Sequence, residues 1–126
     1  MNPRNKYILA AALFFSAIYF VAIPLINRQK ANATVRVIFA HWLKNDSAAA
    51  LGYFSDIKKF PPIYDLKSYE IKKVKFEKVN GRLLARFYVI LNFPINNPMP
   101  SGKTWVCELE KLSRYWRASD FYLSQE

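Results

Sequence analysis

The chain has 126 residues, 17% of them aromatic, and its formal net charge at pH 7 is +10. Disordered chains are poor in aromatic and β-branched residues, so this composition excludes disorder. The single cysteine, Cys107, excludes an internal disulfide. Because the sequence has no cluster of Cys and His residues, a structural zinc site is excluded as well. We expect neither a metal nor a cofactor, and the positive charge favours polyanionic partners such as acidic lipid headgroups, nucleic acid or an acidic protein.

The first predicted element is a membrane span. Tyr7–Ile26 supplies 20 residues without a charged side chain, and a helix needs about 20 apolar residues to cross the hydrocarbon core. A secretory signal has a shorter apolar region of roughly 7–15 residues. The best cleavage match, Ala31-Asn32-Ala33, lies beyond Arg28 and Lys30. We therefore predict an uncleaved signal anchor, with a cleaved, secreted form as the alternative.

The orientation of this span is not decided by counting lysines and arginines, because both ends carry them: Arg4 and Lys6 before it, and Arg28, Lys30 and Arg36 after it. Long domains are translocated largely regardless of charge, and a six-residue tail is typical of a cytoplasmic stub. We expect residues 1–27 to be the stub and transmembrane anchor, and residues 28–126 to be an extracytoplasmic domain.

Helical spacing follows the apolar run directly. The segment 29–43 places apolar residues at positions i, i+3, i+4, i+7 and i+8: Val35, Ile38, Phe39, Trp42 and Leu43. The span is therefore expected to continue into a helix of the domain, which would make a stiff join. Asp46 or Ser47 can cap a second, short helix that reaches Phe54. Two adjacent prolines then predict a loop over residues 58–66.

From residue 68 the apolar period changes to two, which predicts four strands, at 68–79, 82–93, 103–112 and 114–123. A phase shift near Lys72-Lys73 predicts a β-bulge in the first strand. Asn80-Gly81 is a strong signal for a tight hairpin, because both central residues of a type I′ turn need positive φ. Two helices followed by an antiparallel meander predict an α+β fold, in which the helices cover the apolar face of a curved sheet.

This order of elements resembles the nuclear transport factor 2-like superfamily. The resemblance rests on the helix "VRVIFAHWLKND", the following "AAALGYF" and the closing strand "YWRASDFYL", in which Trp116, Arg117, Asp120 and Phe121 match the family's pattern. It covers about residues 30–124 and implies a cone-like fold, with helices packed into a bent four-stranded antiparallel sheet.

A membrane anchor fused to such a domain looks like two groups: inner-membrane scaffold subunits of type IV secretion machines, and small uncharacterised envelope proteins. The resemblance implies a single-pass protein of the bacterial inner (cytoplasmic) membrane with a periplasmic domain. It does not carry a function by itself, since the superfamily hosts enzymes, binders and scaffolds.

Basic residues are most concentrated around the predicted hairpin: Lys72, Lys73, Lys75, Lys78, Arg82 and Arg86. These residues could dock on anionic lipid headgroups or on an acidic partner subunit. Alternatively they form a solvated strand face, where lysine discourages edge-to-edge aggregation. We do not expect nucleic-acid binding, because the sequence has no recognised reader motif.

Candidate polar groups for a pocket are Asp56 and Tyr88, since isomerase-type members of the superfamily place Asp and Tyr side chains inside the cone. Neither lies in a signature that can be matched, and strand aromatics more often fill the core. His41 is the only histidine and has no defined partner in the sequence. We assign no catalytic residue.

The sequence thus predicts a non-enzymatic bitopic membrane protein that acts as a small subunit, scaffold or assembly factor and binds other envelope membrane proteins. The alternative is a small-ligand carrier or isomerase-like enzyme with a pocket inside the cone. That alternative requires polar groups pointing into an open cavity.

Overall fold

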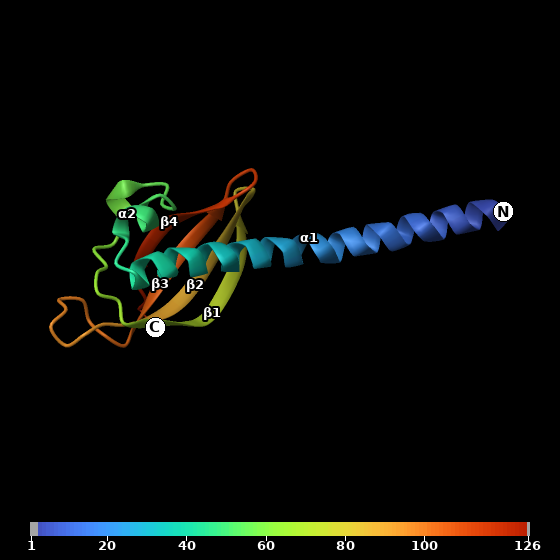
Figure 1. The fold of residues 1–126 in the computed structure, drawn as a ribbon. Coiled ribbons are helices and arrows are strands. Elements are labelled where there is room, and N and C mark those ends of the chain that lie inside the picture. The colour runs from blue at the N-terminus through green and yellow to red at the C-terminus, as the bar shows by residue number, and fades with distance from the viewer. Residues whose placement is uncertain (1–2, 126) are drawn as a thin grey trace. The chain divides into compact units, whose positions relative to one another are not determined.

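The computed structural model describes residues 3–125 and has the predicted α+β fold (Figure 1). It contains one long N-terminal helix, a short helix, a 3₁₀ turn and one four-stranded antiparallel sheet. The elements are α1 (Pro3–Leu43), α2 (Ser47–Leu51), η1 (Ile57–Lys59), β1 (Ser68–Val79), β2 (Arg82–Asn92), β3 (Lys103–Lys111) and β4 (Trp116–Leu123). The chain divides into two compact units, one up to Lys30 and one from Ala31, so the division falls within α1.

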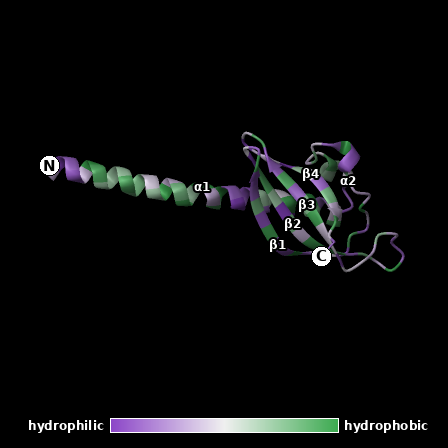
Figure 2. Ribbon diagram, turned by 180° about the vertical axis from the view of Figure 1, so that it is seen from behind, coloured by the Kyte–Doolittle hydropathy of each residue, from purple (hydrophilic) through white to green (hydrophobic). Residues whose placement is uncertain are grey.

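The first unit is an apolar helix. Large apolar side chains along residues 7–26 are exposed on every side of it, and Figure 2 colours this stretch mainly as hydrophobic. The helix is long and apolar enough to cross a membrane, although a signal sequence near an N-terminus has the same properties. In a helix without a polar face, such exposure is unfavourable in water and favourable in lipid.

The second unit is built on an open sheet with the strand order β1-β2-β3-β4. The register of β1 against β2 shifts between Ile71 and Lys73, which confirms the predicted bulge. Asn80 (φ 51°) and Gly81 (φ 78°) form the turn between these strands, as predicted. A second register shift, next to Glu108 where β3 pairs with β4, was not predicted.

Both tight turns of the meander lie at the same end of the sheet (Figure 1). We call this the turn end and define it as residues 78–82 between β1 and β2 together with residues 111–115 between β3 and β4. Neighbouring antiparallel strands reverse direction, so the β2–β3 loop, residues 93–102, lies at the opposite end. We call that end the loop end.

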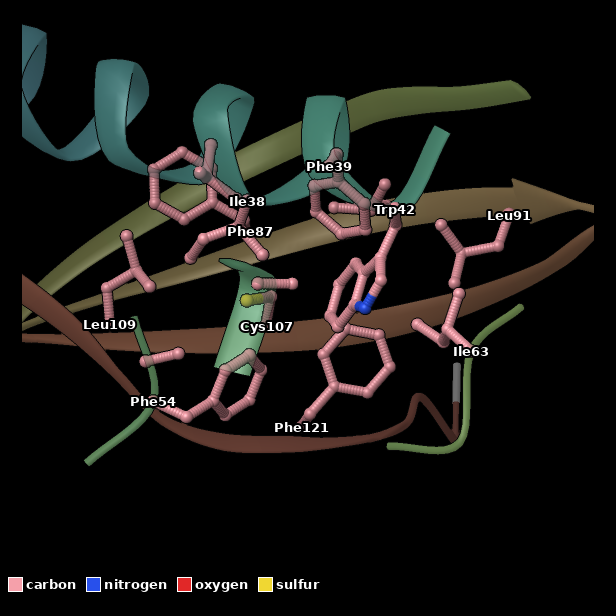
Figure 3. Close-up of a cluster of buried hydrophobic side chains, with 14 of the residues drawn as sticks. Ile38, Phe39, Trp42, Phe54, Ile63, Phe87, Leu91, Cys107, Leu109 and Phe121 are labelled. Carbon is pink, nitrogen blue, oxygen red and sulfur yellow. The ribbon is translucent and has the colours of Figure 1, made fainter. Parts of the chain in front are cut away.

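The C-terminal part of α1 packs on one face of the sheet, here called the inner face (Figure 3). Its residues Ala31, Val35, Ile38, Phe39 and Trp42 are buried. Phe39 stacks on Tyr69 of β1 with ring centroids 4.9 Å apart, and Trp42 meets Phe121 of β4 at 5.7 Å. The helix therefore contacts both edge strands of the sheet, β1 and β4, through a single aromatic cluster.

Leu43 corrects one expectation. The helical spacing included it in the apolar face of the helix, yet its side chain is 41% exposed. The helix ends at this residue, and the chain turns away through Asn45, whose φ is 57°. Ala31, which the apolar pattern did not include, is instead fully buried.

The direction of α1 over the sheet follows from its neighbours. In Figure 3, Ile38 lies on the side of Leu109, near the end of β3, and Trp42 lies on the side of Leu91, near the end of β2. The helix thus runs from the turn end towards the loop end. At the turn end the sheet is curved enough for Phe76 of β1 to meet Trp116 of β4, with ring centroids 6.3 Å apart.

The segment between the helices and the sheet is held by specific hydrogen bonds. Asp46 caps α2 by accepting a hydrogen bond from the Ala49 amide at 3.1 Å. The helix ends at Leu51 and not at Phe54 as predicted, because Phe54 forms a parallel bridge to Ala118 of β4. This bridge continues the sheet for one residue beyond β4.

Candidate functional site

The space between α1 and the sheet is filled with hydrophobic side chains (Figure 3). Trp42, Phe39 and Phe87 are the largest of the fully buried ones. Among residues 3–125, no polar or charged residue is buried. The interior of the domain is therefore a packed core, and the polar groups that could bind or react lie on the surface.

The two pocket candidates from the sequence are not brought together. Asp56 is exposed and caps η1, where its carboxylate accepts a hydrogen bond from the Lys58 amide at 3.0 Å. Tyr88 alternates with the buried residues Phe87 and Val89, so it points away from α1. Neither side chain lines the interior.

The opposite face of the sheet, here called the outer face, is not covered by α1. Figure 2 shows it turned towards the viewer, with α1 behind the strands. The strand register places four side chains in a row across it, Lys73, Tyr88, Val106 and Tyr122. The next row along the strands is charged and consists of Lys75, Arg86, Glu108 and Asp120.

An apolar patch lies on the outer face and consists of Tyr88, Val106 and Tyr122, with Leu123, the last residue of β4, at its border. Val106 is only 2% exposed although it faces away from the core, whereas Tyr122 and Leu123 are 38% and 46% exposed. These four residues line a shallow hollow of about 270 Å³. Partial burial raises the pKa of the Tyr122 hydroxyl, and the Glu108 carboxylate raises it further.

Two lysines lie over the ring of Tyr88. The ammonium nitrogens of Lys73 and Lys75 are 4.4 Å and 5.4 Å from the ring centroid. A cation within about 6 Å of an aromatic face is attracted by the ring quadrupole. These contacts hold two positive charges at the border of the apolar patch.

The charged row next to the patch is an ion-pair network centred on Arg86. Its guanidinium pairs with Glu77, and its Nε lies 3.3 Å from Glu108 Oε2. The hydrogen bond to Glu77 is the main reason why the pKa of Arg86 is raised. Charge-assisted pairs of this kind fix side-chain geometry more firmly than single hydrogen bonds do.

A recess of about 540 Å³ beside this network contains three carboxylates, those of Glu108, Glu110 and Asp120. Each carboxylate has a cationic partner. Arg86 pairs with Glu108, Arg82 with Glu110 at 3.2 Å, and Lys59 with Asp120 at 3.5 Å. The recess is therefore electrically balanced by the protein's own side chains.

The six basic residues singled out in the sequence do not form one patch. Lys73, Lys75, Arg82 and Arg86 lie on the outer face, where the two arginines are engaged in ion pairs. Lys72 is the extra residue at the bulge, and Lys78 pairs with Leu83 on the inner-face side, at an exposed position. The sequence had not identified the carboxylates as partners of the arginines. The short Asn80-Gly81 turn fixes the β1–β2 register and could have indicated Glu77 as one of them.

No family model, curated protein or solved structure matches the chain. Within residues 3–125, no group of three or more His, Cys, Asp or Glu side chains is placed to hold a metal ion. His41 is half-buried next to Tyr53, with ring centroids 5.9 Å apart. Cys107 is fully buried, and desolvation raises the pKa of its thiol to about 12, so the thiol stays protonated at neutral pH.

Proposed function

We propose that this chain is a single-pass, non-enzymatic membrane protein whose domain binds other envelope membrane proteins, as a small subunit, scaffold or assembly factor. The observation that carries the proposal is the outer face of the sheet. Tyr88 and Tyr122 lie on either side of the buried Val106 there, and no helix within residues 3–125 covers this face.

The chemistry of this face suits a protein partner. Tyrosine and arginine are enriched at the energetic centres of interfaces, because they combine a large contact area with polar groups at the tip. The apolar patch has such a tyrosine on each side of Val106, and the ordered Arg86 network borders it. An acidic partner would also meet Lys73 and Lys75 at the border of the patch.

The alternative, a small-ligand site inside the cone, finds no support in the interior. Such a site needs an open cavity lined by a few convergent polar groups. The side chains between α1 and the sheet are fully buried aromatic and aliphatic groups, and the two candidate polar residues, Asp56 and Tyr88, lie elsewhere.

The proposal also covers the superfamily of the domain, the membrane that holds the anchor and the side on which the domain lies. We place the domain in the nuclear transport factor 2-like superfamily because a helix packs on a strongly curved antiparallel meander whose Trp116 and Phe121 join the core. We place the anchor in a bacterial inner membrane and the domain on its extracytoplasmic side. The apolar stretch of α1 supports the anchor, and reporter fusions at each terminus would test the orientation.

The proposal is tested by purification of the tagged full-length chain from native membranes in mild detergent, followed by mass spectrometry of the intact eluate. Stoichiometric membrane partners are expected with the native chain and are expected to be lost with Tyr122→Ser in the apolar patch. Tyr64→Ser is the matched control, because Tyr64 is similarly exposed, at 45%, but lies in a loop. Recovery of the native chain without partners, or equal loss with both variants at unchanged thermal stability, would contradict the proposal.

A further inference from the structure

The turn end of the domain has an unusual composition. Its two segments, residues 78–82 and 111–115, contain no carboxylate and carry four basic side chains: Lys78, Arg82, Lys111 and Arg114. Arg82 pairs with Glu110, yet 72% of its side chain remains exposed. Each turn also presents one exposed residue with apolar surface, Val79 at 36% and Tyr115 at 50%.

The loop end differs in charge, whereas it too presents an exposed apolar side chain, that of Ile95. Its long connection, residues 93–102, contains no charged residue. The neighbouring segment 55–67 mixes lysines with the acidic residues Asp56 and Asp65. The turn-end segments therefore contain basic residues without acidic ones, whereas the loop-end segments contain both kinds or neither.

The chain enters the domain at the turn end. Ala31 is the first residue of the domain, and α1 runs from the turn end towards the loop end. The last residue of the apolar run is Ile26, only five residues earlier. Five residues span at most about 18 Å when fully extended and about 7.5 Å as a helix. Chain connectivity alone therefore keeps the turn end close to any bilayer that the apolar run crosses.

We propose that the turn end rests on the anionic headgroups of the membrane that α1 crosses. Its basic side chains lie against lipid phosphates, and Tyr115 and Val79 enter the headgroup region. The inference depends on the membrane anchorage proposed above, but not on the binding of a protein partner. The domain would then have two binding surfaces: the turn end faces lipid, and the outer face of the sheet stays available to proteins.

The chemistry of the turn end fits a lipid surface. Basic side chains next to an anionic membrane are attracted within a Debye length, about 8 Å at physiological salt. Tyrosine has an apolar ring and a polar hydroxyl, so it is favoured at the boundary between headgroups and acyl chains. Arg117 Cζ lies 5.3 Å from the ring centroid of Tyr115, which adds a further positive charge next to this ring.

The test uses the full-length chain in vesicles of phosphatidylcholine alone, or of phosphatidylcholine and phosphatidylglycerol in equal parts. A fluorophore is attached to Ser113→Cys at the turn end or to Asn96→Cys at the loop end, both exposed positions. Cys107 is fully buried and does not compete for the label in the folded chain. A nitroxide on the lipid headgroup quenches probes that lie near the surface.

Quenching of the Ser113→Cys probe should rise at least about twofold when anionic lipid is included, and added salt should reverse the rise. The Asn96→Cys probe should not respond. The double variant Lys111→Glu/Arg114→Glu should lose the response. Lys67→Glu/Lys103→Glu, which changes the net charge by the same amount at exposed positions away from the turn end, should keep it.

Equal quenching of the Ser113→Cys probe in both lipids, or an equal rise at both probe positions, would overturn the inference while leaving the anchorage intact. An alkaline wash of the vesicles distinguishes failure of the anchorage. A chain that is released by the wash is not anchored by α1, and this result overturns the anchorage together with the inference that depends on it.

Discussion

Replacement of Trp42 by alanine is expected to be among the most destabilising single changes in the domain. Trp42 is 1% exposed and contacts rings from three other segments, those of Phe54, Phe60 and Phe121. A buried tryptophan removes about 150–250 Å² from water. At about 25 cal/mol per Å², this area corresponds to about 4–6 kcal/mol.

Two further effects act in opposite directions on this figure. Alanine leaves a cavity that the surrounding aromatic rings fill only in part, which increases the loss. The Trp42 indole N–H is buried without an acceptor among the described residues, and its removal recovers about 1–3 kcal/mol. The expected net loss for Trp42→Ala is about 3–5 kcal/mol. Trp42→Phe should cost clearly less, because it keeps most of the ring and removes the unpaired N–H.

The assay is urea unfolding of the full-length chain in a mild detergent, followed by tryptophan fluorescence and near-ultraviolet circular dichroism. Val37→Ala is the control on the same helix, because Val37 is 38% exposed and should cost less than about 1 kcal/mol. A loss below about 1 kcal/mol for Trp42→Ala, or equal losses for Trp42→Ala and Val37→Ala, would refute the packing of α1 on the sheet.

Three other predictions concern single residues. Arg86→Ala removes the cation shared by two carboxylates, those of Glu108 (18% exposed) and Glu77 (50% exposed), and should cost about 1–3 kcal/mol in urea unfolding. Arg82→Ala removes a cation that pairs with one carboxylate and is itself 72% exposed, and should cost less than about 1 kcal/mol; equal costs would contradict the central role of Arg86. Burial raises the pKa of the Cys107 thiol from 9.0 to about 12, so the stability that the protonated thiol contributes is complete below about pH 9 and is lost as the pH rises towards 12. The native chain should therefore lose more stability between these pH values than Cys107→Ala does. The thiol should also resist alkylation until the chain unfolds. Gly81→Ala at φ 78° should cost about 1 kcal/mol, whereas Gly52→Ala at φ −60° should be close to neutral; equal melting temperatures would argue against the tight turn.

The fold was predictable from the sequence because its signals are local. Strand β1 has the bounds that the period-two pattern predicted, and the phase shift at Lys72-Lys73 corresponds to the observed bulge. Asn80-Gly81 fixed the first hairpin through its need for positive φ. The helical spacing from Val35 to Trp42 identified the face of α1 that covers the sheet.

The candidate site was less predictable because it depends on contacts between distant segments. Val106 alternates with the inward-facing Trp105 and Cys107, so alternation alone puts it on the face away from the core, yet it is only 2% exposed between Tyr88 and Tyr122 of the neighbouring strands. The partners of the basic residues are likewise set by strand register. The sheet is curved so that β1 and β4 approach each other, and no sequence pattern within a single segment predicts this curvature.

The contacts of α1 with β4 also determine when the domain can fold during biosynthesis. Ribosomes make the helix first and β4 last among the described elements, and Phe39 and Trp42 contact Phe121 of that final strand. Until β4 emerges, the aromatic face of the helix lacks its contacts with Phe121 and is only partly covered by the earlier segments. Such a surface is prone to aggregation and is a typical substrate of chaperones. The nascent chain should therefore depend on a holding factor for most of its synthesis.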